Sequence, residues 1–215
     1  MESQVRGGTR WKRFAVVMVP SVLATAAVGV SLAQGALAAS FSVSGQQFKV
    51  TASHLHGDGF AQYGGIDEVY ASVAGDEKKK KKVPVAISSF ETARINEMCQ
   101  SVKTDIPLVG TVYLRLEAGN DAKKPVRAKN LFIDVAQLDA DAKFKNIDIG
   151  VAVRDKSRGP AVKEGESVLP GGFAQQAESA DLYDVKQTAW ATTAGTFTLN
   201  GLSMRLGTDS KMECY

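Results

Sequence analysis

Apolar side chains recur at every second position through much of the chain after residue 40, and this alternation limits the folds open to it. Successive side chains of a β-strand point to opposite faces, so such a segment has one apolar face and one polar face. Long helical stripes are absent from residues 40–215, and we therefore expect one mostly β domain there. The clearest alternating segments are 48–52, 111–117, 131–135, 147–153 and 197–206.

Two similar blocks sixteen residues apart, Asn130–Asp134 and Asn146–Gly150, favour a β-helix or solenoid-like elongated sheet. A β-sandwich or a partly open barrel accounts for the same alternation. If each strand buries only one face, Asp134 and Asp148 should face solvent. The inward positions are then Leu131, Ile133, Val135, Ile147, Ile149 and Val151.

Several segments are ambiguous in their pattern. Residues 88–102 fit a helix that begins after Ser89, but their alternation favours a strand. Residues 174–187 are predicted as a short helix or a loop. The lysine run Lys78–Lys82 is expected in a solvated loop that protects an edge strand, with anionic head groups or wall polymers as the alternative contact. Glycines and charges predict loops at 57–65, 75–82, 119–124 and 154–172.

A run of 26 residues without a charge, Phe14–Ala39, precedes the alternating region. A helix of this length crosses the ~30 Å hydrocarbon core of a membrane. The basic residues 1–13 should stay in the cytoplasm, so we expect a single-pass membrane protein with residues 40–215 outside the cell. The alternative is a signal peptide cut near Ala38 or Ala39, which would release a secreted protein.

Export affects the interpretation of the two cysteines. Cys99 and Cys214 are the only cysteines in the sequence, and an even number in an oxidising compartment predicts one disulfide bond.

The net charge is less informative. The formal charge of +3 equals the excess of residues 1–13 alone, so the exported part has no net charge and a nucleic-acid partner is not predicted.

His54, His56 and Asp58 are the candidate site residues. On a strand His54 and His56 point to the same face, and Asp58 could complete a set of three metal ligands. The sequence offers no third histidine as a further ligand. We therefore expect neither a metal nor a cofactor and interpret the two histidines as exposed residues at a strand end.

Several stretches together resemble a family of actinobacterial envelope proteins of unknown function. They are MESQVRGGTRWKRFA at the start, LAQGALAASF at 32–41, GFAQYGG at 59–65, MCQSV at 98–102 and QTAWAT at 187–192. The resemblance covers nearly the whole chain and implies an exported, membrane-associated protein. Some members carry the label "cholesterol esterase". Genes of the family also tend to lie beside one for a small polytopic membrane protein, which implies an assembly in the envelope.

The esterase label conflicts with the residues present. A lipase-type hydrolase places its serine on a strained turn, normally within Gly-x-Ser-x-Gly, and its histidine later in the chain. The chain has no such pentapeptide and no histidine after His56. We therefore do not expect this enzyme mechanism.

We expect instead a non-enzymatic, membrane-tethered envelope protein. Its β domain would bind an envelope partner, such as the small polytopic membrane protein, or assemble as a homo-oligomer. The alternatives are a lipid- or sterol-binding or transfer protein and an ester hydrolase. A continuous apolar concavity would favour lipid binding, and a serine or aspartate that meets a histidine in a cleft would favour the hydrolase.

Overall fold

The computed structural model describes residues 44–71, 80–106, 108–163 and 165–215, and most of this part is β-strand. The mostly β domain is therefore confirmed, whereas the predicted segments 1–13 and 14–39 lie outside the described residues. No helix in the described part is long and apolar enough to span a membrane. The elements are β1 (Phe48–Tyr70), β2 (Lys80–Asn96), β3 (Met98–Ile106), β4 (Gly110–Ala118), β5 (Val126–Lys145), β6 (Asp148–Ala152), η2 (Val153–Asp155), β7 (Ser167–Val168), β8 (Phe173–Thr198), β9 (Ser203–Gly207) and η3 (Ser210–Met212).

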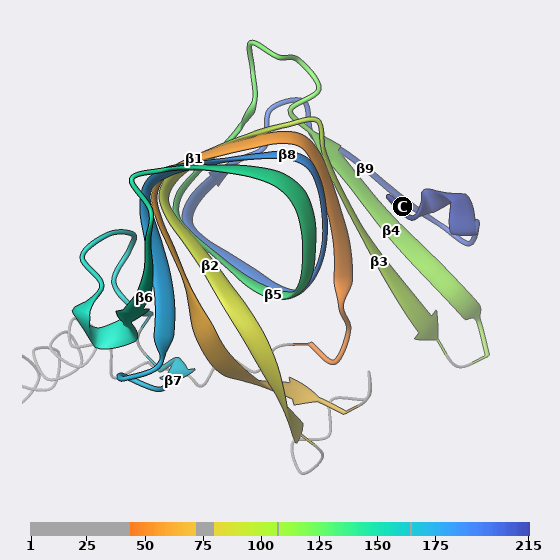
Figure 1. Ribbon diagram of the computed structural model, residues 1–215. Helices are drawn as coiled ribbons and strands as arrows, with labels where there is room; N and C mark the ends of the chain where they lie inside the picture. The colour runs from red at the N-terminus through yellow and green to blue at the C-terminus, as the bar shows by residue number, and fades with distance from the viewer. Residues whose placement is uncertain (1–43, 72–79, 107, 164) are drawn as a thin grey trace, which may run out of the picture. The chain divides into compact units, whose positions relative to one another are not determined.

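Four long strands form a sheet that closes on itself (Figure 1). Strand β1 pairs with β2, β2 with β5, β5 with β8, and β8 with β1, always antiparallel. These strands are 23, 17, 20 and 26 residues long, which lets them twist and curl around a common interior. The pairing that closes the ring is short, from Phe48–Ala189 to Ala52–Val185.

The closed antiparallel sheet is neither the solenoid nor the sandwich expected from the sequence. A β-helix stacks parallel coils and a sandwich packs two separate sheets, whereas this chain turns back on itself and its outer strands meet. The two similar blocks have another origin. Asn130 and Asn146 both adopt positive φ angles, 47° and 51°, a conformation that asparagine tolerates better than most residues. The similarity of the two blocks therefore reflects a shared local backbone conformation, and the blocks are not repeats of a coil.

The interior of the closed sheet contains the main hydrophobic core. The rings of Phe60 on β1 and Phe90 on β2 lie with their centroids 5.3 Å apart. On β5, Leu131, Ile133 and Val135 are at most 4% exposed and belong to the same core. Their predicted inward orientation is confirmed. Each fully buried side chain of this kind stabilises the fold by roughly 1.5–3 kcal/mol.

Residues 153–163 and 165–172, here called the strap, cover part of the outer face of the sheet. Because of this cover, both faces of β5 are buried at Asp134, which is only 4% exposed. The prediction that Asp134 faces solvent is therefore wrong. It assumed that each strand buries only one face, but here the strap also covers the outer face of β5. The outer cluster joins Val153, Val162 and Val168 of the strap to Tyr63, Ile87 and Phe132 of the sheet.

Strand β6 is a short strand beside β8, and its orientation also differs from the prediction. Ile149, expected inside, is 67% exposed, whereas Asp148 is exposed as expected. The pairing with β8 shifts register between Ile149 and Val151, at Gly150 with φ 92°. A shift by one residue moves the following side chains to the other face.

Other segments differ from the loops and the helix that were considered. Residues 57–65 lie within β1 and residues 174–187 within β8, while 88–102 form parts of β2 and β3, as their alternation favoured. The loop predicted at 119–124 is confirmed. Lys80–Lys82 are not in a loop but in β2, opposite Tyr70, Val69 and Glu68 of β1.

Strands β3, β4 and β9 extend the sheet beyond the ring (Figure 1). The predicted disulfide bond between Cys99 and Cys214 is confirmed, and it ties the C-terminus to β3. Arg115 of β4 also donates to the carbonyl oxygens of Met212 and Glu213. The last residues are therefore held against this extension.

Candidate ligand-binding cavity

An apolar cavity of about 210 Å³ lies inside the closed sheet. Protein interiors are close-packed and contain few voids larger than a water molecule, so a cavity of this size is a specific feature of the fold. All four long strands contribute to its wall. The lining residues are Leu55, Phe60, Gln62, Ser88, Phe90, Ile133, Leu138, Ala140, Ala142, Phe144, Leu182 and Gln187.

The cavity is closed at one end and more open at the other. Phe60, Phe90 and Ile133 are at most 4% exposed. In contrast, the lining residues near the end of β5 are half-buried at Leu138 and exposed at Ala142. These alternate residues of β5 share one face, as the strand geometry requires. The mouth of the cavity is therefore formed by the last third of β5.

A smaller void of about 20 Å³ continues the interior in another direction. The two voids share Leu55, Ile133 and Gln187 in their walls. The wall of the smaller void also includes Met98 at the start of β3 and Phe197 near the end of β8. The two voids are therefore neighbours, and the side chain of Gln187 lies in the wall of both.

Two of the polar lining residues bond to one another. Gln62 Nε2 donates to Ser88 Oγ at 2.8 Å, and Gln62 Oε1 accepts from Gln175 Nε2 at 2.6 Å. Gln62 and Ser88 belong to neighbouring strands, whereas Gln175 comes from β8. Gln62 and Ser88 therefore form a small, hydrogen-bonded polar patch in a mostly apolar wall.

Gln187 differs from these residues because its side chain makes no hydrogen bond to any described residue, although only 6% of it is exposed. Within the described residues, its amide is not among the fully buried side-chain groups without a partner, so it remains accessible from the cavity. Its side chain offers both donors and an acceptor to a molecule in the cavity. No Lys, Arg, Asp or Glu is among the lining residues, so this recognition is suited to a neutral group.

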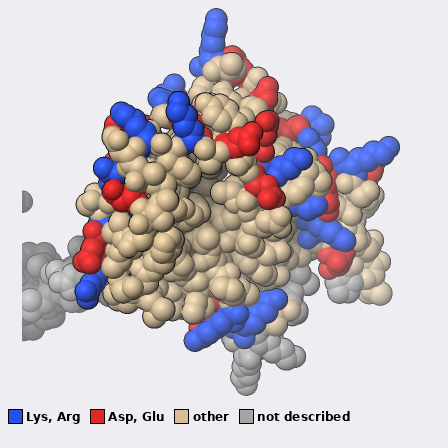
Figure 2. Space-filling model, viewed as in Figure 1, with Lys and Arg blue, Asp and Glu red and all other residues tan. Residues whose placement is uncertain are grey.

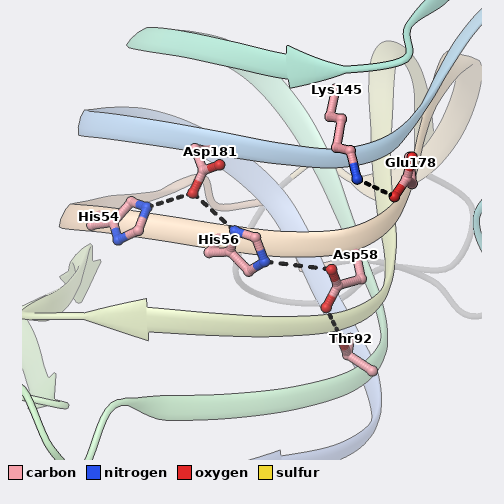
Figure 3. Close-up of polar contacts among 7 residues, drawn as sticks. All are labelled: His54, His56, Asp58, Thr92, Lys145, Glu178 and Asp181. Atoms are coloured by element: carbon pink, nitrogen blue, oxygen red, sulfur yellow. Dashed lines mark hydrogen bonds and ion pairs between the residues drawn. The ribbon is translucent and has the colours of Figure 1, made fainter.

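The predicted site residues His54, His56 and Asp58 lie together on the outer side of the ring (Figure 3). The structure adds Asp181 of β8, whose Oδ1 accepts from His54 Nε2 at 2.9 Å and from His56 Nδ1 at 2.8 Å. His56 Nε2 lies 3.4 Å from Asp58 Oδ1, and Thr92 donates to Asp58. The two histidines therefore share a face and bridge β1 to β8. They are half-buried within β1, not exposed at a strand end as expected.

Asp181 is held as a carboxylate by this arrangement. Burial raises its pKa, but the hydrogen bonds from His56 and then His54 outweigh that effect, so the net pKa lies below the usual range. Asp181 was missed in the sequence because 174–187 was interpreted as a helix or loop. A strand assignment alone would not have been sufficient, because the pairing of β8 with β1 brings Asp181 to the histidines.

The histidine cluster offers limited chemistry. Within residues 44–71, 80–106, 108–163 and 165–215, no group of three His, Cys, Asp or Glu side chains has a geometry that could hold a metal ion. An aspartate does meet a histidine here, but no serine or threonine hydroxyl of the described part bonds to either ring. Both cysteines are in the disulfide bond. A nucleophile positioned by a base is therefore missing from this cluster.

A second polar cluster lies beneath the strap. One side-chain oxygen each of Asp67, Asp134 and Glu166 is buried without a hydrogen-bond partner among the described residues. Lys163 Nζ approaches Glu166 Oε1 at 3.3 Å as an ion pair, and Tyr63 OH donates to Glu166 Oε2 at 3.1 Å. Burial, followed by the charge of Asp67, raises the pKa of Asp134 to about 7, although Lys163 opposes this.

The comparisons with known proteins give a family but no activity. Residues 44–215 match a family of unknown function, DUF6230, and this range begins where the described structure begins. No curated protein and no solved structure matches the chain. The chain therefore belongs to DUF6230, a family of unknown function.

Proposed function

We propose that the β domain binds a neutral, elongated apolar molecule, such as a lipid with one acyl chain, inside the closed sheet. The observation that carries the proposal is the cavity of about 210 Å³. For comparison, an apolar cavity of about 150 Å³ in a protein core is enough to bind benzene. The interior here is larger and has a mouth at the end of β5.

The cost of leaving such a space empty supports binding. The cavity wall is mostly apolar, and apolar surface that stays in contact with water costs about 25 cal/mol per Å² relative to burial. An apolar ligand that fills the cavity would recover part of this free energy.

The polar lining determines the class of ligand. Gln187 lies next to both voids and can donate to or accept from an ester, amide or hydroxyl group. The absence of a charged residue among the lining side chains disfavours a phosphate or a carboxylate as the buried end. A monoacylglycerol or a fatty alcohol fits both conditions.

Native mass spectrometry of the protein extracted in mild detergent tests the proposal, followed by titration with monoacylglycerols of increasing chain length. We expect a retained or added lipid at one copy per chain, and an affinity that rises with chain length and then levels off. Ala140→Phe should block the mouth and abolish binding. Ala136→Phe is the matched control, because Ala136 is exposed on the same strand and does not line the cavity.

Equal binding by the two variants, or no binding of any chain length by the native protein, would refute the proposal. Thermal unfolding of both variants should be cooperative, so that loss of binding reflects the blocked mouth and not loss of the fold.

A further inference from the structure

An exposed apolar surface lies beside the strap, away from the mouth of the cavity. Ile66 of β1, Leu169 of the strap and Phe173 at the start of β8 are 44%, 76% and 62% exposed. They surround a groove of about 400 Å³ that also includes Pro84 of β2. We call these four residues the apolar groove.

The apolar groove is built by strand pairing and is therefore held in place. Ile66 lies opposite Pro84 on one side and opposite Ser167 of β7 on the other. Gly172 N–H donates to the Leu169 carbonyl oxygen at 2.8 Å, which closes the turn that presents Leu169. The exposed side chains thus project from ordered backbone.

Lysines lie next to the groove on the same strand as Pro84. Lys80, Lys81 and Lys82 begin β2, and Lys81 and Lys82 are exposed. Glu68 of β1 is opposite Lys82, so among the described residues at this end the lysines outnumber the exposed acidic side chain. Figure 2 shows blue side chains gathered along the lower border of a broad area without charged residues.

We propose that the apolar groove and these lysines dock on the surface of an anionic lipid bilayer. Exposed apolar side chains that enter the interface, with Lys or Arg beside them at the level of the head groups, are the features of proteins that lie on a membrane.

The short segment between the charge-free run and the domain supports a lipid bilayer as the binding partner. The charge-free run ends at Ala39 and the described part begins at Ser44. A linker this short spans at most about 3.5 Å per residue. Both ends of β1 lie toward the lower side of the domain in Figure 1, the side that carries the lysines. If the run at 14–39 is retained as a membrane anchor, it keeps the domain within reach of a bilayer.

Hydrogen–deuterium exchange tests the proposal. The full chain is measured in detergent, in phosphatidylcholine nanodiscs and in nanodiscs that also contain phosphatidylglycerol. We expect slower exchange in peptides covering 80–86 and 165–174 in the anionic discs only. Peptides from β9, which also exposes apolar side chains, should exchange equally in all three. Binding of a lipid in the cavity would instead protect 138–144, so the two proposals are distinguishable.

Two pairs of variants make the test specific. Leu169→Ser with Phe173→Ser should remove the protection, whereas Leu206→Ser, at a side chain 71% exposed on β9, should not. Lys81→Glu with Lys82→Glu should abolish the protection in the discs that contain phosphatidylglycerol, and Lys123→Glu with Lys124→Glu at exposed positions of the 119–124 loop should leave that protection unchanged. Equal exchange in the three environments, or equal effects of test and control variants, would overturn the proposal.

Discussion

The imidazole ring of His54 lies parallel to the phenol ring of Tyr183, with centroids 4.5 Å apart and planes inclined by 4°. These residues come from β1 and β8, beyond the point where backbone pairing between the two strands stops at Ala52 and Val185. The stack and the carboxylate of Asp181 therefore continue the closure of the ring through side chains. Figure 3 shows the contacts of Asp181 with His54 and His56.

Asp181→Asn should weaken this seam. We expect the free energy of unfolding at pH 7 to fall by about 1 kcal/mol, because the histidines lose a charged acceptor. The folded-state pKa of Asp181 is below its usual value, so its contribution is present above the unfolded-state pKa and is lost as pH falls through the folded-state pKa. Urea unfolding at several pH values should therefore show the two proteins converging in acid. Asp141→Asn, at an exposed position of β5, is the control.

Asp134 should have the opposite pH dependence. Its pKa is raised to about 7, chiefly by burial, so between its ordinary pKa and pH 7 the folded chain binds more protons than the unfolded chain. The free energy of unfolding should then fall as pH rises through this window. Asp134→Asn should raise stability at pH 8 by about 1–3 kcal/mol and have little effect at pH 4. An unchanged pH profile in urea unfolding would contradict the burial of a charged Asp134.

Gly57→Ala and Gly64→Ala form a matched pair on β1. A Cβ at Gly57 would lie 2.2 Å from Phe90 Cδ1, whereas a Cβ at Gly64 meets nothing within 4 Å. We expect the first change to cost about 1–3 kcal/mol through overpacking of the core. The second should be neutral or slightly stabilising, because alanine restricts the unfolded chain. Chemical denaturation of both variants measures the difference, and similar values would be inconsistent with the packing of Phe90.

Reduction of Cys99–Cys214 should destabilise the domain strongly. The bond links residues separated by 115 positions, and the chain-entropy relation gives about 4–5 kcal/mol for a loop of that size. Thermal unfolding with and without a reductant measures the loss. The double variant Cys99→Ser with Cys214→Ser should resemble the reduced protein and be insensitive to reductant.

The charge-free run at 14–39 predicts fractionation with membranes, with residues 40–215 accessible to protease only from outside the cell. The mass of the recovered protein identifies its first residue. Recovery mainly as soluble protein that begins near Ser40 would show that the run is a cleaved signal peptide.

The alternation of apolar residues was sufficient to predict most strands but not their partners. Leu131, Ile133 and Val135 face inward as predicted, because that pattern depends on local geometry alone. The closure of β8 on β1 depends on register between distant segments, which no local pattern contains. In β8 the pattern is also interrupted at Asp184, a residue with φ 51°, so buried positions change phase from Leu182 to Val185.

The candidate site was only partly accessible to sequence analysis for a related reason. His54 and His56 were recognised by their spacing, but Asp181 is remote in the sequence. In the sequence Gln187 cannot be distinguished from a surface glutamine. Only the closed sheet shows that its side chain lines the interior. Asp134 gave a signal that could have been used, because it stands between Ile133 and Val135 in a stretch where both faces are apolar.

Closure of the ring imposes an order on folding. Strand β1 is synthesised first, but one of its edges pairs with β8, which is almost the last strand to leave the ribosome. Pairing between such distant segments is slow and leaves an open strand edge in the meantime. Cys214 follows β9, the last strand, so its disulfide bond to Cys99 can form only after all the strands have been synthesised. The bond therefore stabilises the sheet only at the end of strand assembly.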